Sequence, residues 1–136
     1  MIGAFLETLV PSNSLIGIVD DDADIPVAIS SLLRSLGYKA ECFHSAEQLL
    51  SRESLTDFFC IISDIHMPSM DGIALTSALS DIQRDLPVIL MTGRMEPGLE
   101  QKAYASGAIS VVAKPFSFDD LSSNLDKAGD RRRERI

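Results

Sequence analysis

Five short runs that predict β-strands, separated by longer stretches with helical periodicity, constrain the fold of this chain more than any other feature. The runs are residues 15–19, 39–43, 58–63, 87–91 and 109–113. The first is apolar throughout, which is typical of a parallel strand covered on both faces. Alternation of strands and helices implies right-handed crossovers between parallel strands. The sequence therefore predicts an α/β fold with one doubly wound, five-stranded parallel sheet.

Helix start and stop signals occur between these runs. Gly37 ends a helix that begins near Ile25, and Ser45 with Gln48 forms a capping box for a short second helix. Ser117 is expected to cap the last helix and Gly129 to end it. Two further helices are expected at residues 73–80 and 96–106.

Composition limits both domain count and function. The 136 residues are enough for one domain, and 46% are hydrophobic, which supplies a full core. The net charge of −8 repels phosphates, so we expect no direct binding of nucleic acid. No apolar run reaches transmembrane length, so we expect no membrane association. Cys42 and Cys60 lack metal or redox spacing and are expected to be buried, reduced thiols of a cytoplasmic protein.

The ends of the chain differ in character from its middle. Residues 1–13 form an N-terminal extension with apolar residues at helical spacing, interpreted either as a docking amphipathic helix or as a frayed terminus. The predicted domain covers residues 14–128. Residues 129–136 are a basic C-terminal tail or the start of a linker.

Polar residues collect where four of the predicted strands end. Asp20 and Asp21 follow the first strand and Asp64 the third, while Thr92 and Lys114 follow the fourth and fifth. In an open α/β sheet, ligands bind beyond the carboxyl ends of the strands. These five residues therefore form the candidate site.

Three neighbouring carboxylates repel one another, and a divalent cation resolves that conflict. Magnesium prefers oxygen ligands and acts beside phosphates. A carboxylate is also a nucleophile toward phosphorus, and a lysine, a hydroxyl and a metal suit the charge on a transferring phosphoryl group. This donor set indicates phosphoryl chemistry.

Four segments, in this order, resemble the signature blocks of response regulator receiver domains of bacterial two-component systems. The segments are residues 18–22 (IVDDD), 62–72 (ISDIHMPSMDG), 91–93 (MTG) and 112–116 (VAKPF). The resemblance covers roughly residues 14–128. Ser45-Ala46-Glu47 and the Lys-Pro-Phe segment are similar to receivers of the nitrogen-fixation type.

The resemblance implies a flavodoxin-like (βα)5 fold with strand order 2-1-3-4-5 and assigns a role to each site residue. Asp64 would accept a phosphoryl group from a histidine kinase or phosphotransfer protein. Asp20, Asp21, Asp64 and the backbone carbonyl of His66 would hold Mg²⁺ or Mn²⁺. Thr92 and Lys114 would contact phosphoryl oxygens, and the Lys114–Pro115 peptide bond would be cis. Small phosphodonors would also label the chain, which would then dephosphorylate itself.

The resemblance further implies a signalling switch rather than a metabolic enzyme. Its output face would be the fourth helix, fifth strand and fifth helix, contacting an output domain, a downstream protein or a second copy in a homodimer. Val111 occupies a switch position that is usually aromatic, so coupling to Thr92 would differ here. His66 and Arg94, at the edge of the site, would influence phosphate lifetime.

Three other interpretations compete with this one. The aspartates after the first strand would be helix caps, or Asp20, Asp22, Thr92, Lys114, Asp119 and Asp120 would form the site of a haloacid-dehalogenase-type phosphohydrolase. The second alternative leaves Asp64 unexplained. A calcium loop starting at Asp20 is rejected because Ile25 stands where its glycine is required. The sequence leaves open whether the receiver stands alone or precedes an output domain.

Overall fold

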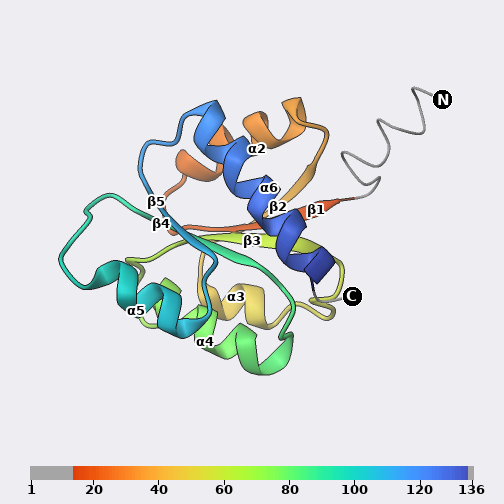
Figure 1. Cartoon of the computed structure of the whole chain (residues 1–136). Coiled ribbons are helices and arrows are strands. Elements are labelled where there is room, and N and C mark those ends of the chain that lie inside the picture. The colour runs from red at the N-terminus through yellow and green to blue at the C-terminus, as the bar shows by residue number, and fades with distance from the viewer. Residues whose placement is uncertain (1–13, 135–136) are drawn as a thin grey trace.

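The computed structural model describes residues 14–134, which form a central sheet with helices on both faces (Figure 1). The elements in chain order are β1 Leu15–Val19, α2 Ile25–Ser35, β2 Lys39–Phe43, α3 Ala46–Leu50, β3 Phe58–Asp64, α4 Gly72–Ile82, β4 Val88–Thr92, α5 Leu99–Ser106, β5 Ser110–Ala113 and α6 Phe118–Glu134. All paired strands are parallel, in the order β2-β1-β3-β4-β5. The predicted fold and strand order are confirmed.

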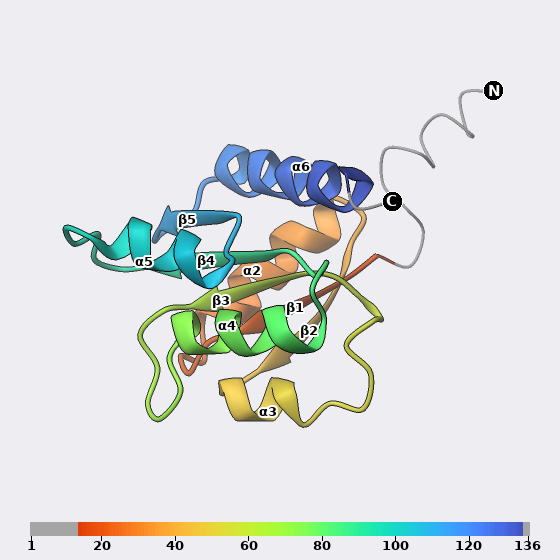
Figure 2. The same cartoon turned by 60° about the horizontal axis from the view of Figure 1, so that its bottom comes forward.

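Side chains of the central strands alternate between two buried layers, which explains why β1 and most of β3 and β4 are apolar, whereas the edge strand β2, KAECF, is not. In β4, Val88 and Leu90 join the cluster under α3, α4 and α5, whereas Ile89 and Met91 join the cluster under α2 and α6. Figure 2 shows α6 and α2 on one side of the sheet and α3 and α4 on the other. The core therefore lies in two layers, one on each face.

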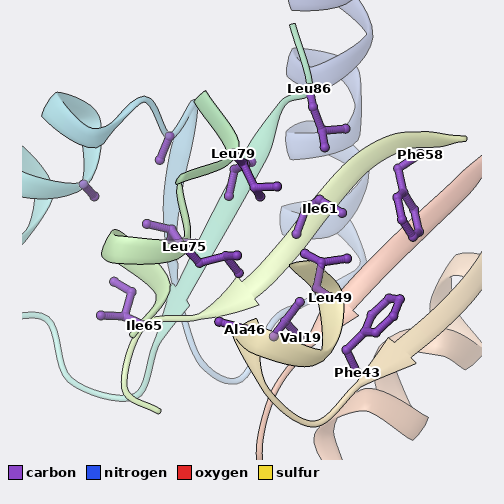
Figure 3. Packing of buried hydrophobic residues seen from close by; sticks show 14 of the residues in the cluster. Val19, Phe43, Ala46, Leu49, Phe58, Ile61, Ile65, Leu75, Leu79 and Leu86 are labelled. Atoms are coloured by element: carbon purple, nitrogen blue, oxygen red, sulfur yellow. The ribbon is translucent and has the colours of Figure 1, made fainter. Parts of the chain in front are cut away.

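Large side chains on the α3 and α4 side interlock closely (Figure 3). Phe43 and Phe58 meet edge to face, with ring centroids 6.0 Å apart. The ring of Phe58 also fills the space above Gly17, where an added Cβ would come within 3.1 Å of it. Each such buried side chain stabilises the fold by about 1.5–3 kcal/mol.

Several local expectations need correction. The last helix does not end at Gly129 but continues to Glu134, because α6 packs Leu121, Leu125 and Ala128 on the sheet and runs on past them. Residues 129–134 are therefore helical. Helix α5 begins at Leu99 rather than near Glu96, since Pro97 and Gly98, with φ 83° at the glycine, precede it.

The two cysteines differ from each other. Cys60 is buried in β3, as expected, and burial raises the pKa of its thiol. Cys42 is exposed, contrary to expectation, because β2 is an edge strand. Residues 1–13, interpreted as either an amphipathic helix or a frayed terminus, lie outside the described residues.

Candidate phosphoacceptor site

Strand order brings the predicted site residues to one edge of the sheet. β3 lies between β1 and β4, with Val19 paired with Ser63 and Asp64 paired with Met91. Asp20 and Thr92, each one residue further along its strand, therefore flank Asp64. Lys114 follows β5 and reaches across β4 toward the same point. This edge adjoins the switch in strand order, where open α/β sheets bind ligands.

Three carboxylates form a compact cluster there. Oxygen atoms of Asp20, Asp21 and Asp64 all lie within 4.8 Å of one another. Asp20 and Asp64 are buried, with relative exposures of 0% and 5%, whereas Asp21 is exposed. Two buried carboxylates and one exposed carboxylate fit a divalent cation that prefers oxygen and keeps several waters. Among residues 14–134, this is the one group of acidic, histidine or cysteine side chains with metal-ligand spacing.

The loop after β1 holds this cluster and starts α2. Asp20 Oδ1 accepts a hydrogen bond of 2.9 Å from the amide of Asp22. Asp22 Oδ1 in turn accepts from the amides of Asp24 and Ile25, at 2.7 and 3.2 Å, which lowers the pKa of its carboxyl. Capping therefore explains Asp22. Asp24 occupies the N-cap position but makes no side-chain cap bond.

Lys114 joins two of the carboxylates. Its Nζ lies 3.2 Å from Asp20 Oδ2 and 3.1 Å from Asp64 Oδ1. Burial raises the pKa of Asp64, and the charge of Asp20 acts in the same direction, against the opposing effect of Lys114. Burial alone would lower the pKa of Lys114, but its hydrogen bonds to Asp64 and Asp20 prevail and raise it. The peptide bond from Lys114 to Pro115 is cis, as the resemblance implied.

The Thr92 hydroxyl is turned to its own loop. Its Oγ1 donates to the carbonyl of Arg94 at 2.8 Å and accepts from the amide of Arg94 at 3.1 Å. The threonine is fully buried at the end of β4. Val111 is half-buried and packs against the core cluster under α3, α4 and α5.

An open recess of about 470 Å³ leads to Asp64. It is lined by Asp64, His66, Gly93, Arg94, Glu96 and Lys114. The exposed Arg94 and Glu96 face each other across 3.8 Å. The sequence identifies Asp64 and Lys114 as site residues and places His66 and Arg94 at the edge of the site. It gave no signal for Glu96, which follows no strand end and belongs to no signature block.

The residues proposed for a phosphohydrolase do not assemble. Asp119 and Asp120 lie exposed in the first turn of α6. Asp120 Oδ2 accepts from the amide of Ser117, and Ser117 Oγ accepts from the amide of Asp120, which is a capping arrangement. These two acids therefore start a helix and take no part in the carboxylate cluster.

None of the helices within residues 14–134 combines the length and apolar character that crossing a membrane requires.

Comparison with known proteins identifies the family. Residues 16–126 match the family model of the response regulator receiver domain. The chain is 37% identical over 109 residues to the response regulator protein TmoT of Ectopseudomonas mendocina, covering 80% of this chain and 50% of TmoT. It is 33% identical over 111 residues to the transcriptional regulatory protein FixJ of Bradyrhizobium diazoefficiens, covering 82% and 54% respectively. The chain thus spans about half the length of these two relatives.

A solved structure shares the fold. The chemotaxis protein CheY4 of Vibrio cholerae superposes with a TM-score of 0.78 at 27% identity, over 85% of this chain and 98% of CheY4. Sequence family, sheet order and the clustered aspartates agree, and the chain belongs to the response regulator receiver domain family of two-component signalling systems.

Proposed function

We propose that this receiver takes a phosphoryl group from a histidine kinase or phosphotransfer protein onto Asp64 and thereby changes its binding to a partner. The observation that carries this proposal is the setting of the Asp64 carboxylate. It is buried at the end of β3, lies 3.1 Å from the Lys114 ammonium, and opens onto a recess. A phosphodonor can therefore approach the Asp64 carboxylate only through this recess.

The transfer is a simple exchange of bonds. A carboxylate oxygen of Asp64 forms a bond to phosphorus while the phosphorus–nitrogen bond of a phosphohistidine breaks, and the leaving imidazole takes up a proton. The Lys114 ammonium would neutralise charge on a phosphoryl oxygen. In autodephosphorylation, water would cleave the acyl phosphate and restore the Asp64 carboxylate.

Mg²⁺, or Mn²⁺ in its place, fits the carboxylate cluster. Asp20, Asp21, Asp64 and the backbone carbonyl of His66 would hold the ion, which when bound offsets negative charge on the phosphoryl oxygens. Asp20 is already oriented by the amide of Asp22. Asp20 and Asp64 are buried on the sheet side of the site, whereas Asp21 is exposed and leaves room for water.

The switch would begin at Thr92. To contact a phosphoryl oxygen, its hydroxyl must leave the carbonyl of Arg94, which frees the loop before α5. Val111 is too short to follow it as an aromatic ring would, so the signal would pass through the loop and α5. Arg94 and His66 border the recess and would set phosphate lifetime by controlling access of water.

The output face would consist of α5, β5 and α6, the fourth and fifth helices of the (βα)5 unit and the strand between them. Tyr104 on α5 and Phe118 on α6 are exposed there, at 49% and 47%. Such side chains suit an output domain, a downstream protein or a second receiver in a homodimer. The net charge of −8 argues against direct contact with nucleic acid.

The proposed domain organisation keeps the predicted limits. Residues 14–128 would be the receiver and residues 1–13 an extension. Residues 129–136 would be a basic tail or the start of a linker, and their first part continues α6. Because a histidine kinase would deliver the phosphoryl group inside the cell, the proposed location is the cytoplasm.

Intact-mass spectrometry tests the proposal. Wild-type protein treated with acetyl phosphate and Mg²⁺ is expected to gain one phosphoryl group, and Asp64→Asn to gain none. Asp81→Asn removes an exposed carboxylate on α4 and should be labelled like wild type. Equal labelling of Asp64→Asn and Asp81→Asn would disprove the assignment of Asp64.

A further inference from the structure

The first turn of α4 lies directly against the backbone that carries Asp64. The amide of Gly72 donates to the carbonyl of Ile65 at 2.8 Å. A Cβ added to Gly72 would meet three backbone atoms, at 2.3 Å from the Asp64 carbonyl oxygen, 2.9 Å from Ile65 Cα and 3.1 Å from the Asp64 carbonyl carbon. Backbone cannot rotate away as a side chain does, so any other residue at position 72 must displace it.

Position 72 requires glycine because there is no space for a Cβ, and not because of its backbone conformation. Gly37, Gly98 and Gly107 have positive φ, whereas Gly72 does not and lies in the first turn of an ordinary α-helix. An alanine would suit its backbone angles. The close approach to Asp64 is therefore the feature that excludes a side chain.

Other contacts hold the helix firmly in this position. Asp71 Oδ1 caps α4 by accepting from the amide of Ala74 at 2.8 Å. Thr76 Oγ1 donates to the carbonyl of Gly72 at 2.7 Å. Leu75 and Leu79 bury the inner face of the helix in the core. The helix therefore resists moving outward, and added bulk at position 72 would move the acceptor strand instead.

We propose that Gly72 is a positioning residue for phosphoryl transfer, which sets the place of the Asp64 carboxylate through the backbone. This inference rests on the proposed role of Asp64. The carboxylate lies 3.1 Å from Lys114 and within 4.8 Å of two other carboxylates, so a displacement of its Cα alters every contact of the reacting group. Displacement of a reacting group by about 1 Å costs on the order of a hundredfold in rate.

The test compares two glycine-to-alanine variants by the rate of labelling with acetyl phosphate, per folded molecule, over a range of Mg²⁺ concentrations. In Gly17→Ala the new Cβ would meet Ile61 Cδ1 at 2.7 Å, the end of a flexible side chain in the core. We expect Gly72→Ala to lose at least about tenfold in maximal rate and to need more Mg²⁺. Gly17→Ala should stay within about twofold of wild type, because loss of stability alone does not alter the rate of the folded fraction.

A second pair of variants decides the matter even if Gly72→Ala does not fold. Asp71→Ala removes the cap of α4, whereas Ser45→Ala removes the equivalent cap of α3, where Ser45 Oγ accepts from Gln48. Asp71→Ala should label at least about threefold more slowly than wild type, with Ser45→Ala unchanged. A charge control, Asp71→Asn, keeps a capping group and should behave as wild type.

The outcomes separate the two proposals. A wild-type rate in folded Gly72→Ala, or equal rates in Asp71→Ala and Ser45→Ala, would overturn the positioning role while leaving Asp64 as acceptor. Failure of wild type itself to be labelled would overturn the proposed function and the role of Gly72 with it.

Discussion

Replacing Lys114 with methionine should destabilise the fold, because it leaves two buried carboxylates without their counter-charge. The lysine Nζ lies 3.2 Å from Asp20 Oδ2 and 3.1 Å from Asp64 Oδ1. The side chains of Asp20 and Asp64 are only 0% and 8% exposed, and that of Lys114 is 19% exposed. Methionine keeps most of the apolar stem and removes the charge.

The size of the effect depends on the competition between attraction and desolvation. At an effective dielectric constant of about 20, each of the two contacts contributes about 5 kcal/mol of Coulomb attraction. Desolvation of the three groups offsets most of this in the intact cluster, but breaking a buried pair typically costs about 3–5 kcal/mol. Because the cluster borders an open recess, we expect Lys114→Met to lower the free energy of unfolding by about 2–4 kcal/mol at neutral pH without Mg²⁺.

Urea unfolding followed by circular dichroism measures this difference. The deficit of Lys114→Met should shrink on addition of Mg²⁺, and also as the pH falls through the raised pKa of Asp64, because protonation removes one unpaired charge. Lys102→Met, at an exposed position on α5, should stay within about 0.5 kcal/mol of wild type. A Lys114→Met variant as stable as Lys102→Met would refute the reasoning.

Three further predictions concern stability and reactivity. Because burial raises the pKa of Asp64, the folded state holds that proton more tightly than the unfolded state and stability falls as pH rises through this window. At pH 7 without Mg²⁺, the unfolding midpoint of Asp64→Asn should therefore lie at a higher urea concentration than that of wild type, and this difference should vanish at about pH 3. A midpoint for Asp64→Asn below that of wild type at pH 7 would contradict this prediction. Arg52 contacts Glu41 at 2.9 Å and Asp57 at 3.1 Å, and it also donates to the carbonyl of Ser54. Arg52→Met should therefore lower the free energy of unfolding, measured by urea titration, by about 1 kcal/mol, and by less in 1 M salt. A loss of stability that does not change with salt would exclude the ion pairs as its cause. Iodoacetamide should modify Cys42 alone in the native protein and Cys60 only after unfolding, as peptide mass mapping would reveal; rapid native labelling of Cys60 would mean that β3 opens readily.

Much of the fold could be predicted because local signals agree with the tertiary structure. The five predicted strand runs match the observed strands to within one residue at each end, since the central strands are covered on both faces and are mostly apolar. Ser45 and Gln48 form the expected capping interaction. Strand order came from the resemblance and not from periodicity, which carries no information on which strands are neighbours.

The remaining features depend on contacts between distant segments. Glycine at position 129 is a stop signal by local propensity, yet packing of α6 on the sheet carries the helix past it. The expectation that Cys42 is buried is wrong, because a cysteine signals burial by residue type alone and the edge position of β2 exposes it. In the sequence, Gly72 has the character of a turn residue. Its close contact with the backbone of Asp64 depends on how α4 packs beside the end of β3, which the sequence does not reveal.

Locating the acyl phosphate within the chain tests the central claim most directly. After treatment with acetyl phosphate and Mg²⁺, reduction with borohydride converts a phosphorylated aspartate to homoserine, which peptide mass spectrometry assigns to one position. We expect homoserine at position 64, dependent on Mg²⁺. Homoserine at position 20, the nucleophile of the phosphohydrolase alternative, would contradict the assignment of Asp64 as the phosphoacceptor.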